Sequence, residues 1–211
     1  MFWYPREADL SGKDDKGQSL EEFLDGYDPH KYELPAVTTD ILVFVRSEPI
    51  PRLLLVRRGR HPYYGMLALP GGFLEMKETL DQGAARELME ETGVTGVPLQ
   101  QLGAYGTLGR DPRLRIVSVA YTVVLDKEPA LQAGDDAADA AFCNLVVSKQ
   151  ENNGILQYHM EATHPTSAMN AWADIEEQNG QRTIVRSTIA SDHALMVLDA
   201  VEKLGFAIEP A

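Results

Sequence analysis

Apolar runs separated by short polar breaks follow one another along most of the chain, and their spacing predicts a series of strands. β-branched and continuously apolar segments indicate the strands, while proline and glycine mark the turns between them. The expected strands are Ala36–Val45, Arg52–Val56, the segment MLALP, Val97–Tyr105, Arg115–Leu125 and the segment AAFCNLVV. The first two are separated by SEPIP, whose two prolines interrupt any continuous strand.

The stretch from Leu69 to Val94 contains the clearest helix signal. Thr79 is followed three residues later by Gln82, which is the arrangement of a capping box, and Gly93 stands where a helix would end in a left-handed turn. Three apolar positions recur every four residues: Leu80, Ala84 and Leu88. We therefore expect a helix over roughly Leu80–Thr92 with this apolar stripe buried.

Two further helices are expected towards the ends of the chain. SLEEFLDGYDPHKY predicts a short helix, with Ser19 as its N-cap and Glu22 completing a capping box. HALMVLDAVEKL has apolar residues at helical spacing, begins after Ser191 or Asp192 and stops at Gly205.

The chain divides into an N-terminal arm, residues 1–35, and one larger domain, residues 36–211. The arm carries several aromatic residues: Phe2, Trp3, Tyr4, Phe23 and Tyr27. They belong either to a surface arm without a function or to a segment that packs on a second subunit. Between residues 149 and 190 the pattern weakens, and ILQYHMEA and QRTIVRSTI suggest two strands of an inserted hairpin.

Composition limits the possible partners. The chain has 211 residues, 44% of them hydrophobic, which suffices for a substantial core. Its formal net charge of -13 argues against binding long nucleic acid, which requires clustered lysine and arginine. A small phosphorylated substrate held through a metal ion remains compatible, because the cation supplies positive charge.

The remaining composition favours a cytoplasmic protein that does not enter a membrane. Cys143 is the single cysteine, so it cannot form an internal disulfide. The N-terminal residues lack the pattern of a signal peptide. The longest apolar run, Ile116 to Leu125, contains polar residues and is too short to cross a bilayer as a helix.

Carboxylates gather on one face of the expected central helix. Glu87 and Glu91 are four residues apart and point the same way, with Glu90 beside them. Arg86 can pair with neighbouring carboxylates, but one arginine does not neutralise three of them. A hard divalent cation would, because Mg²⁺ prefers carboxylate oxygens and keeps waters and substrate phosphates as its other ligands.

The glycines before the helix agree with this interpretation. Gly71 and Gly72 lack a side chain, so the backbone there can turn and approach a ligand closely, offering a carbonyl to a metal or amides to a phosphate. The alternative is an ordinary amphipathic helix with a solvated acidic face. An acidic helix end by itself would favour that alternative.

The spacing of the glycines, glutamates and arginine decides between the two. Gly72, Glu78, Arg86-Glu87-Leu88, Glu90-Glu91 and Gly93-Val94 resemble the signature of the Nudix hydrolases at every defined position. The resemblance implies an α/β fold, an α/β/α sandwich with a mixed β-sheet. It also implies hydrolysis of a nucleoside diphosphate linked to another group, with water attacking phosphorus.

By the same resemblance, Glu87 and Glu91 are metal ligands, Glu90 is a third ligand or a partner, and the Gly71 carbonyl is a further ligand. Arg86 would orient the glutamates, and Glu87, Glu90, Glu91 and Arg86 form the catalytic set. The cofactor implied is Mg²⁺, with Mn²⁺ as a substitute. The general base is either a glutamate of the motif or an acidic residue on a later segment. Candidates there are Asp135, Asp136, Asp139 and Glu151.

Two basic segments outside the motif are candidates for substrate binding. RLLLVRRGRHPYYGMLALPGG and GRDPRLRIVSVAY resemble the ADP-ribose pyrophosphatase branch of the family. Their candidate phosphate and ribose ligands are Arg57, Arg58, Arg60, Arg110, Arg113 and Arg115, together with Gly72. Tyr63 or Tyr64 is a candidate for stacking on adenine. The alternative is that these are exposed loop charges and a partly buried aromatic pair.

The leading hypothesis is hydrolysis of ADP-ribose to AMP and ribose 5-phosphate. A second hypothesis is a Nudix-like sensor that binds ADP-ribose and regulates transcription; against it, the region after Lys149 has no basic run suited to DNA. A third is hydrolysis of another dinucleotide or of a nucleoside triphosphate. The family resemblance and the aromatic arm also suggest a homodimer.

Overall fold

The computed structural model describes residues 12–47, 49–132 and 137–211, with the side chains of residues 137 and 138 left out. The aromatic residues Phe2, Trp3 and Tyr4 and the candidate bases Asp135 and Asp136 lie outside these ranges. The chain separates into two compact units, Met1–Leu34 and Pro35–Ala211. In the first unit, α1 (Leu20–Asp25) has the expected capping box between Ser19 and Glu22, and none of its residues is buried.

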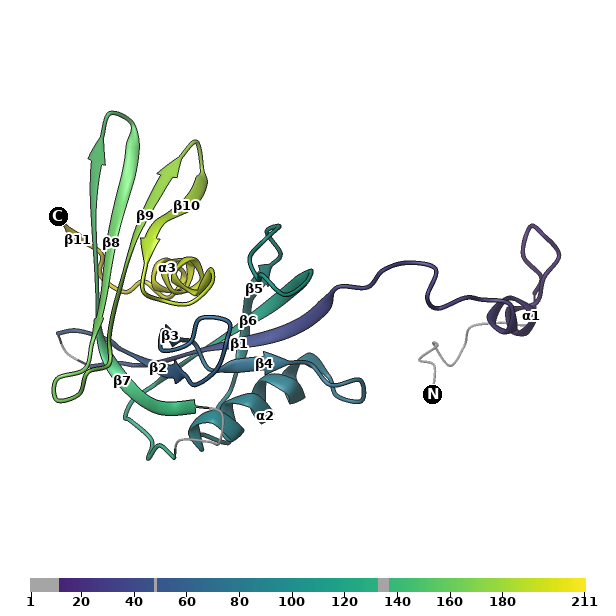
Figure 1. Ribbon diagram of the computed structural model, residues 1–211, viewed down its shortest axis with the longest axis horizontal. Helices are drawn as coiled ribbons and strands as arrows, with labels where there is room; N and C mark the ends of the chain where they lie inside the picture. The colour runs from purple at the N-terminus through teal and green to yellow at the C-terminus, as the bar shows by residue number, and fades with distance from the viewer. Residues whose placement is uncertain (1–11, 48, 133–136) are drawn as a thin grey trace. The chain divides into compact units, whose positions relative to one another are not determined.

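A mixed β-sheet is the central element of the second unit (Figure 1). Its main strands are β1 (Ala36–Val45), β2 (Arg52–Arg58), β5 (Gln100–Tyr105), β6 (Ile116–Leu125), β7 (Ala137–Asn152), β8 (Ile155–Thr163), β9 (Asn170–Gln178) and β10 (Gln181–Ser187). They are arranged in the order β10-β9-β8-β7-β2-β1-β6-β5. The short strands β3 (Leu67–Ala68), β4 (Gly71–Phe73) and β11 (Glu209–Pro210) pair with β2, β1 and β7. Because β1 runs parallel to β6 and antiparallel to β2 and β4, the predicted mixed sheet is confirmed.

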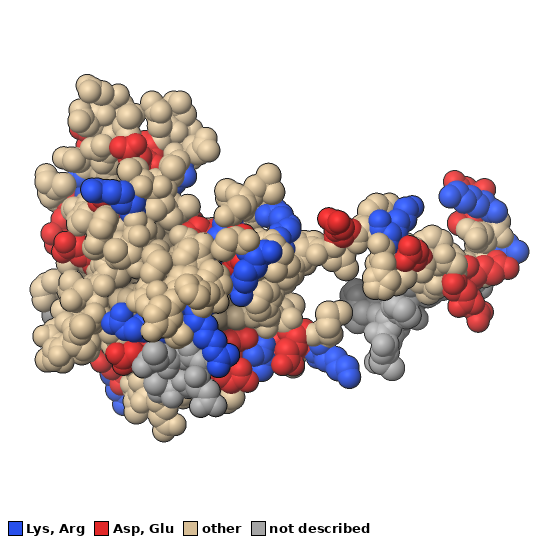
Figure 2. All heavy atoms as spheres, viewed as in Figure 1, with Lys and Arg blue, Asp and Glu red and all other residues tan. Residues whose placement is uncertain are grey.

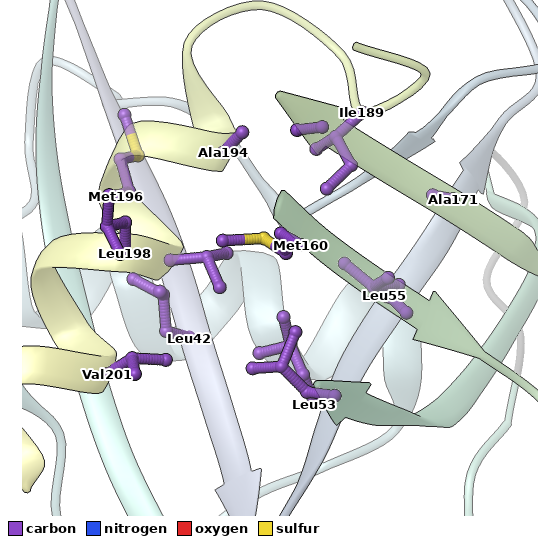
Figure 3. Packing of buried hydrophobic residues seen from close by; sticks show 14 of the residues in the cluster. Leu42, Leu53, Leu55, Met160, Ala171, Ile189, Ala194, Met196, Leu198 and Val201 are labelled. Carbon is purple, nitrogen blue, oxygen red and sulfur yellow. The ribbon is translucent and has the colours of Figure 1, made fainter. Parts of the chain in front are cut away.

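Helices cover both faces of this sheet. Ile41 and Val43 of β1 pack with Leu88 of α2 (Leu80–Thr92) in one core cluster. Leu42 and Phe44, the alternate positions of the same strand, pack with residues of α3 (His193–Leu204) in another. Figure 3 shows the α3 side of this core. Successive side chains of a strand point to opposite faces, so the continuous apolar run of β1 is explained by burial on both sides. The predicted α/β/α sandwich is confirmed.

The ends of the two long helices follow the expected chemistry, with one exception. Thr79 and Gln82 form the capping box of α2, and Gly93 adopts a left-handed conformation with φ of 74°. α3 ends at Gly205, which also has a left-handed φ, of 70°. Asp192 occupies the N-cap position of α3, but its side chain makes no capping hydrogen bond.

The region of residues 149–190 differs from the expectation. β7 continues through Lys149 to Asn152, and the segment thought to connect two strands contains β9. β7, β8, β9 and β10 pair in sequence as an antiparallel meander that is continuous with the main sheet. The hairpins of this meander stand beside α3 in Figure 1.

Two global properties bear on possible partners. None of the helices in the described ranges is long and apolar enough to cross a membrane. Figure 2 shows acidic and basic side chains interspersed on the viewed face of the described residues.

Candidate active site

The acidic end of α2 is organised around Arg86. Its guanidinium donates to Glu78 at 2.6 and 3.0 Å, to Glu87 at 2.8 Å and to Glu90 at 3.1 Å. It also donates to the carbonyl of Phe73 at 3.0 Å, which ties the helix to β4. The hydrogen bonds from Arg86 are the largest cause that lowers the pKa of Glu78, to about 2. Arg86 therefore joins Glu78, Glu87 and Glu90 in one hydrogen-bonded set.

Two glycines of β4 allow the helix to approach the sheet closely. A Cβ on Gly72 would lie 2.5 Å from both carboxylate oxygens of Glu87. A Cβ on Gly71 would lie 2.8 Å from Asp40 Oδ1, and the Gly71 N–H donates to Glu91 Oε2 at 2.9 Å. The absence of side chains at both positions is what lets Glu87, Glu91 and Asp40 gather beside the β4 backbone.

Burial disfavours the ionised forms of the two inward-facing glutamates. Desolvation is the main cause that raises the pKa of Glu91, to about 7, and the charge of Glu87 contributes in the same direction. Desolvation likewise raises the pKa of Glu87, although Arg86 opposes it. These are two carboxylates whose negative charge the surrounding protein only partly compensates.

A cavity of about 510 Å³ opens above these groups. Most of the expected site residues line it: Arg57, Arg58, Arg60, Tyr63, Gly71, Gly72, Arg86, Glu87, Glu91, Arg110 and Arg113. Glu90 is outside that lining, and its side chain is 51% exposed. Tyr64 is 67% exposed and is also outside it, as is Arg115, which donates to the carbonyl of Gly106. The structure thus brings Glu87 and Glu91 of α2 and most of the basic candidates into one cavity.

The arginines differ in how their guanidinium groups are used. Arg57 donates through both Nη atoms to the carbonyls of Gly65 and Ala168. The Arg113 guanidinium donates two hydrogen bonds to Asp111 and lies over the ring of Phe73. Arg58 donates through Nε to the Pro62 carbonyl at 2.9 Å, and its Nη atoms make no hydrogen bond within the described residues.

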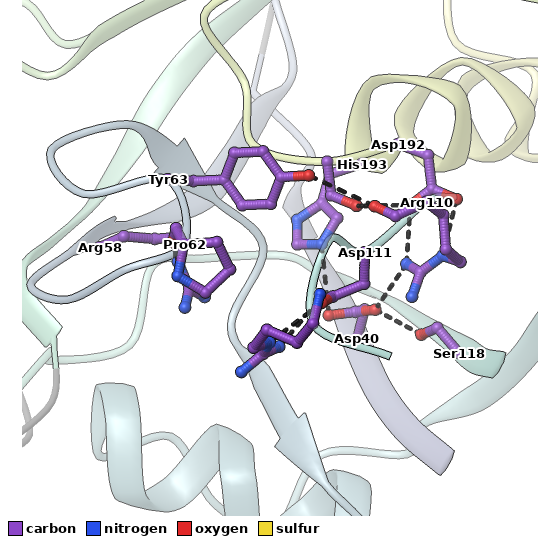
Figure 4. A network of polar contacts seen from close by, with 11 residues as sticks. Asp40, Arg58, Pro62, Tyr63, Arg110, Asp111, Ser118, Asp192 and His193 are labelled. Carbon is purple, nitrogen blue, oxygen red and sulfur yellow. Dashed lines mark hydrogen bonds and ion pairs between the residues drawn. The ribbon is translucent and has the colours of Figure 1, made fainter. Parts of the chain in front are cut away.

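Arg110 is buried, with a side chain only 5% exposed. It donates twice to Asp192, at 2.7 and 2.8 Å, and its Nη2 lies 3.7 Å from Asp40 Oδ2. The hydroxyl of Ser118 donates to the same Asp40 oxygen. Figure 4 shows this network together with His193, whose Nε2 lies 3.5 Å from Asp40 Oδ1.

Sequence reasoning did not identify Asp40, Asp192 or His193 as site residues. A signal existed for two of them. Asp40 is the only charged residue in the strand AVTTDILVFV, and His193 opens a helix whose inner face is otherwise apolar. A buried polar residue in such a setting is informative because burial must be compensated by partners.

Two residues with unusual backbone conformations converge on the Arg110 carbonyl. Tyr63 has φ of 65° and Ser191 has φ of 51°, although neither is glycine. The Tyr63 hydroxyl donates to the Arg110 carbonyl at 3.3 Å, and the Ser191 hydroxyl donates to it at 2.7 Å. Such conformations persist only where surrounding contacts hold them, and they concentrate at functional sites.

The family assignment follows from comparison with known proteins. The model of the NUDIX domain matches residues 34–158, which is more than half of the chain. The chain belongs to the NUDIX family. The matched range includes α2, β4 and the arginines of the cavity, so the Nudix motif found in the sequence lies in the site that the structure assembles.

Two related proteins have names that refer to ADP-ribose. An ADP-ribose pyrophosphatase of Methanocaldococcus jannaschii is 39% identical over 122 residues, covering 56% of this chain and 69% of that protein. The ADPR responsive transcriptional repressor NtrR of Acinetobacter baylyi is 34% identical over 110 residues, covering 51% of this chain and 44% of the repressor. The family match and the first of these relatives identify the chain as a Nudix pyrophosphohydrolase.

Solved structures extend the similarity over most of the chain. A MutT/nudix family protein from Enterococcus faecalis aligns with a TM-score of 0.70 at 28% identity, covering 89% of this chain and 70% of the other. The NUDIX domain of Shewanella oneidensis NrtR, solved in complex with ADP ribose, aligns with a TM-score of 0.64 at 25% identity. That alignment covers 89% of this chain and 99% of the other.

Nudix hydrolases generally use a divalent metal ion, and the residues present fit one. Glu87 and Glu91 offer carboxylate oxygens to a metal ion. Because both side chains are largely buried, their negative charge is poorly compensated by the protein. No set of three or more His, Cys, Asp and Glu side chains within the described ranges forms a complete metal site. Mg²⁺ suits this situation because it usually takes one or two carboxylates and completes its shell with waters and substrate phosphates.

The candidates for the general base on β7 occupy different ends of the strand. Asp139 pairs in register with Arg57, an arginine of the cavity. Glu151 pairs with Leu156 near the turn into β8, twelve residues further along β7. At roughly 3.3 Å per residue that separation is about 40 Å along the strand, and Glu151 is not among the described residues that line the cavity.

Proposed function

We propose that this Nudix protein hydrolyses ADP-ribose to AMP and ribose 5-phosphate in the presence of Mg²⁺. The observation that carries the proposal is the single cavity of about 510 Å³, in which acidic groups of α2 and arginines of two separate segments face the same space. Carboxylates suit a metal-bound diphosphate, and arginines suit its phosphate oxygens. The ADP-ribose relatives supply the choice of nucleotide.

Glu87, Glu91 and the Gly71 carbonyl would hold the metal, with Glu90 as a further ligand or partner. When bound, Mg²⁺ supplies Lewis-acid activation of the diphosphate and of a water molecule, and Mn²⁺ can replace it. Arg86 holds Glu87 and Glu90 in place through the hydrogen bonds described above. Gly72 leaves the space that the Glu87 carboxylate occupies.

Of Arg57, Arg58, Arg110 and Arg113, Arg58 is best placed to contact phosphate. Its Nε is fixed by Pro62, and its positive charge already lowers the pKa of Glu91, so it faces the acidic site. Arg57, Arg110 and Arg113 each hold protein groups and shape the cavity through them. Of Tyr63 and Tyr64, Tyr63 is better placed to contact the adenine ring of the substrate, because it lines the cavity.

The direct test is product identification with purified protein, Mg²⁺ and ADP-ribose in ¹⁸O-labelled water. We expect AMP and ribose 5-phosphate, with the label in one product. Glu91→Gln should lower turnover by about two to four orders of magnitude, because it removes a charge from the catalytic site. Glu151→Gln is the matched control and should leave turnover unchanged.

A second pair of variants tests the assignment of Arg58. Arg58→Gln should raise KM for ADP-ribose about tenfold or more, the usual cost of losing a charged hydrogen bond to substrate. Arg186→Gln, at a side chain 72% exposed on β10, is the control. Equal KM values in both variants would remove Arg58 from the substrate site.

Other substrates of the same family are tested by a panel. If ADP-ribose is left intact while another dinucleotide or a nucleoside triphosphate is consumed, the substrate assignment is wrong and the family assignment stands. The products then show which phosphate is attacked.

The second candidate function is an ADP-ribose-binding regulator of transcription. It is favoured by the 89% coverage of this chain in the alignment with the NrtR NUDIX domain. A gel shift with promoter DNA at physiological salt, lost on addition of ADP-ribose, would support it. The net charge of -13 and the interspersed surface charges lead us to expect no shift.

Sedimentation velocity in the same buffer tests the expected homodimer.

A further inference from the structure

His193 connects the start of α3 to the two sides of the Nudix site. Its Nδ1 accepts a hydrogen bond from the Leu69 N–H at 3.0 Å, and its Nε2 lies 3.5 Å from Asp40 Oδ1. Leu69 precedes the Pro70-Gly71 segment, and Asp40 pairs in register with Gly71. The imidazole thus contacts Leu69, which lies between β3 and β4, and Asp40 of β1, the strand that pairs with β4. Figure 4 shows His193 facing Asp40.

These contacts determine the form of the imidazole. Because Nδ1 accepts the Leu69 N–H, it carries the lone pair, and the proton of the neutral ring is on Nε2, facing Asp40. Burial, the largest cause, lowers the pKa of His193, which agrees with a neutral ring. Nδ1 is thus occupied by the Leu69 N–H, and Nε2 faces the carboxylate of Asp40.

Packing by itself does not account for a histidine at this position. The buried residues that follow it in α3 are alanine, leucine, valine and methionine. An apolar residue would avoid the cost of burying an imidazole, but it would leave the Leu69 N–H without its acceptor. The network around it is also anchored: Arg110 binds Asp192 at the start of α3 and lies beside Asp40.

The contacts lead from His193 to a catalytic glutamate. Gly71, placed by Leu69 on one side and by Asp40 on the other, donates its N–H to Glu91 at 2.9 Å. A shift of this backbone would change the direction of the Gly71 amide and carbonyl. We propose that His193 is a positioning residue of the hydrolytic site, whose imidazole joins the Leu69 amide to Asp40 and thereby holds Gly71 against Glu91. The inference rests on the proposed function.

Three variants separate this role from a general contribution to folding. His193→Phe keeps a ring and removes both polar contacts. His193→Asn keeps an acceptor close to the position of Nδ1. Tyr105→Phe is the matched control, because it deletes a 2.7 Å hydrogen bond between β5 and Asp199 of the same helix without changing a residue that lines the cavity.

Amide hydrogen exchange, followed by NMR, tests the positioning without any substrate. We expect the Leu69 and Gly71 amides to exchange about ten times faster or more in His193→Phe, because the acceptor that protects Leu69 is lost and the adjoining backbone is released. His193→Asn should restore protection at Leu69, and Tyr105→Phe should leave both amides unchanged. Unchanged exchange of both amides in His193→Phe would overturn the proposal. If His193→Phe does not fold, His193→Ala, which also lacks the acceptor, takes its place. Unchanged protection of Gly71 together with full activity in His193→Ala would then overturn the proposal.

Kinetics and metal binding give the functional readouts. His193→Phe should lower kcat for ADP-ribose about 10- to 100-fold, the usual cost of losing a group that orients a metal ligand, with KM changed less than about threefold. Mn²⁺ titration by EPR, without substrate, should show weaker binding, with partial recovery in His193→Asn. Equal losses in His193→Phe, His193→Asn and Tyr105→Phe would reduce His193 to a structural residue and overturn the proposal. If wild-type protein leaves ADP-ribose intact, the proposed function fails, while exchange and Mn²⁺ binding still decide the role of His193.

Discussion

Folding buries the carboxylate of Glu91 and thereby disfavours its ionised form. Its pKa in the folded protein is about 7, raised mainly by desolvation, compared with an ordinary value of 4.5. The stability that this proton contributes is therefore fully present below pH 4.5 and is lost as pH rises to about 7. A shift of this size corresponds to about 3 kcal/mol.

Glu91→Gln should remove that pH dependence in protein treated with EDTA. Glutamine has nearly the same shape but no charge, so the variant should gain stability relative to wild type by about 3 kcal/mol between pH 4.5 and pH 7. Urea unfolding of both proteins at pH 5 and pH 8 measures the difference. Mg²⁺ should reduce the gap at pH 8 by binding the ionised wild-type site. Parallel stability curves for the two proteins would contradict the burial argument.

Gly72 offers a second test, because a methyl group there would meet the Glu87 carboxylate at 2.5 Å. Gly72→Ala should displace that carboxylate and lower kcat for ADP-ribose about tenfold or more, as expected for a misplaced catalytic group. The fold should remain, since the clash is with the end of a side chain. Gly103→Ala, where the nearest atom is 4.0 Å away, is the control and should keep full activity. Comparable kcat values for the two variants would show that the close approach is unimportant.

Local spacing is what made the α2 residues predictable. Arg86, Glu87 and Glu91 lie on one short helix, and helical periodicity places their side chains relative to one another. Asp40 and His193 come from elements far apart in the chain, and only the folded structure brings them together. The hydrogen-bond partners of the arginines could not be predicted either, because the acceptors for Arg57 and Arg110 include residues distant in sequence.

Capping explains why the bounds of α2 were predicted correctly. Thr79 Oγ1 accepts from the Gln82 N–H, and the Gln82 side chain accepts from the Thr79 N–H. Thr79→Ala should lower the free energy of unfolding by about 1 kcal/mol, the usual value of an N-cap. It should change kcat by less than about twofold, because Glu87 and Glu91 lie two and three turns further along the helix. Urea unfolding and steady-state kinetics measure the two effects, with Thr107→Ala at an exposed loop position as control. A tenfold loss of kcat would show that the cap controls the site.

Strands with weak side-chain signals were predicted less well. β9 buries Ala171, Ala173 and Ile175 at alternate positions, but two of these three are alanine, which has a low preference for strands. The expected strand from Val97 begins only at Gln100, after Pro98, which has no N–H to donate. In both segments, pairing with neighbouring strands decides the structure, and that information is not local.

The order of the strands belongs to the molecule as a whole. Alternation along β1 predicts burial on both faces, but it does not say that β1 lies between β2 and β6. That order lets Ser118 on β6 donate a hydrogen bond to Asp40 on β1, which lines the cavity and pairs with Gly71. The site could therefore be predicted as far as the glutamates and glycines of the motif, while its second wall depends on topology.

Every described residue that lines the cavity belongs to the unit Pro35–Ala211, and α1 of the first unit buries none of its residues. A variant that begins at Pro35 should therefore keep the sheet, both helices and the active site. We expect one cooperative urea transition, since the unit has a core on each face of its sheet. Its kcat for ADP-ribose should lie within about twofold of the full chain, because no catalytic group is removed.

Circular dichroism, urea unfolding and steady-state kinetics of the variant and the full chain measure these outcomes. Sedimentation velocity of the same two proteins shows whether residues 1–34 support the expected dimer: loss of the dimer with kcat retained assigns the arm to assembly. A fall in kcat of tenfold or more, in a variant that still folds cooperatively, would show that the arm takes part in the active site. The arm exposes aromatic residues such as Phe23 and Tyr27. Contacts of these residues with a second subunit would give the first outcome, and contacts with the active site would give the second.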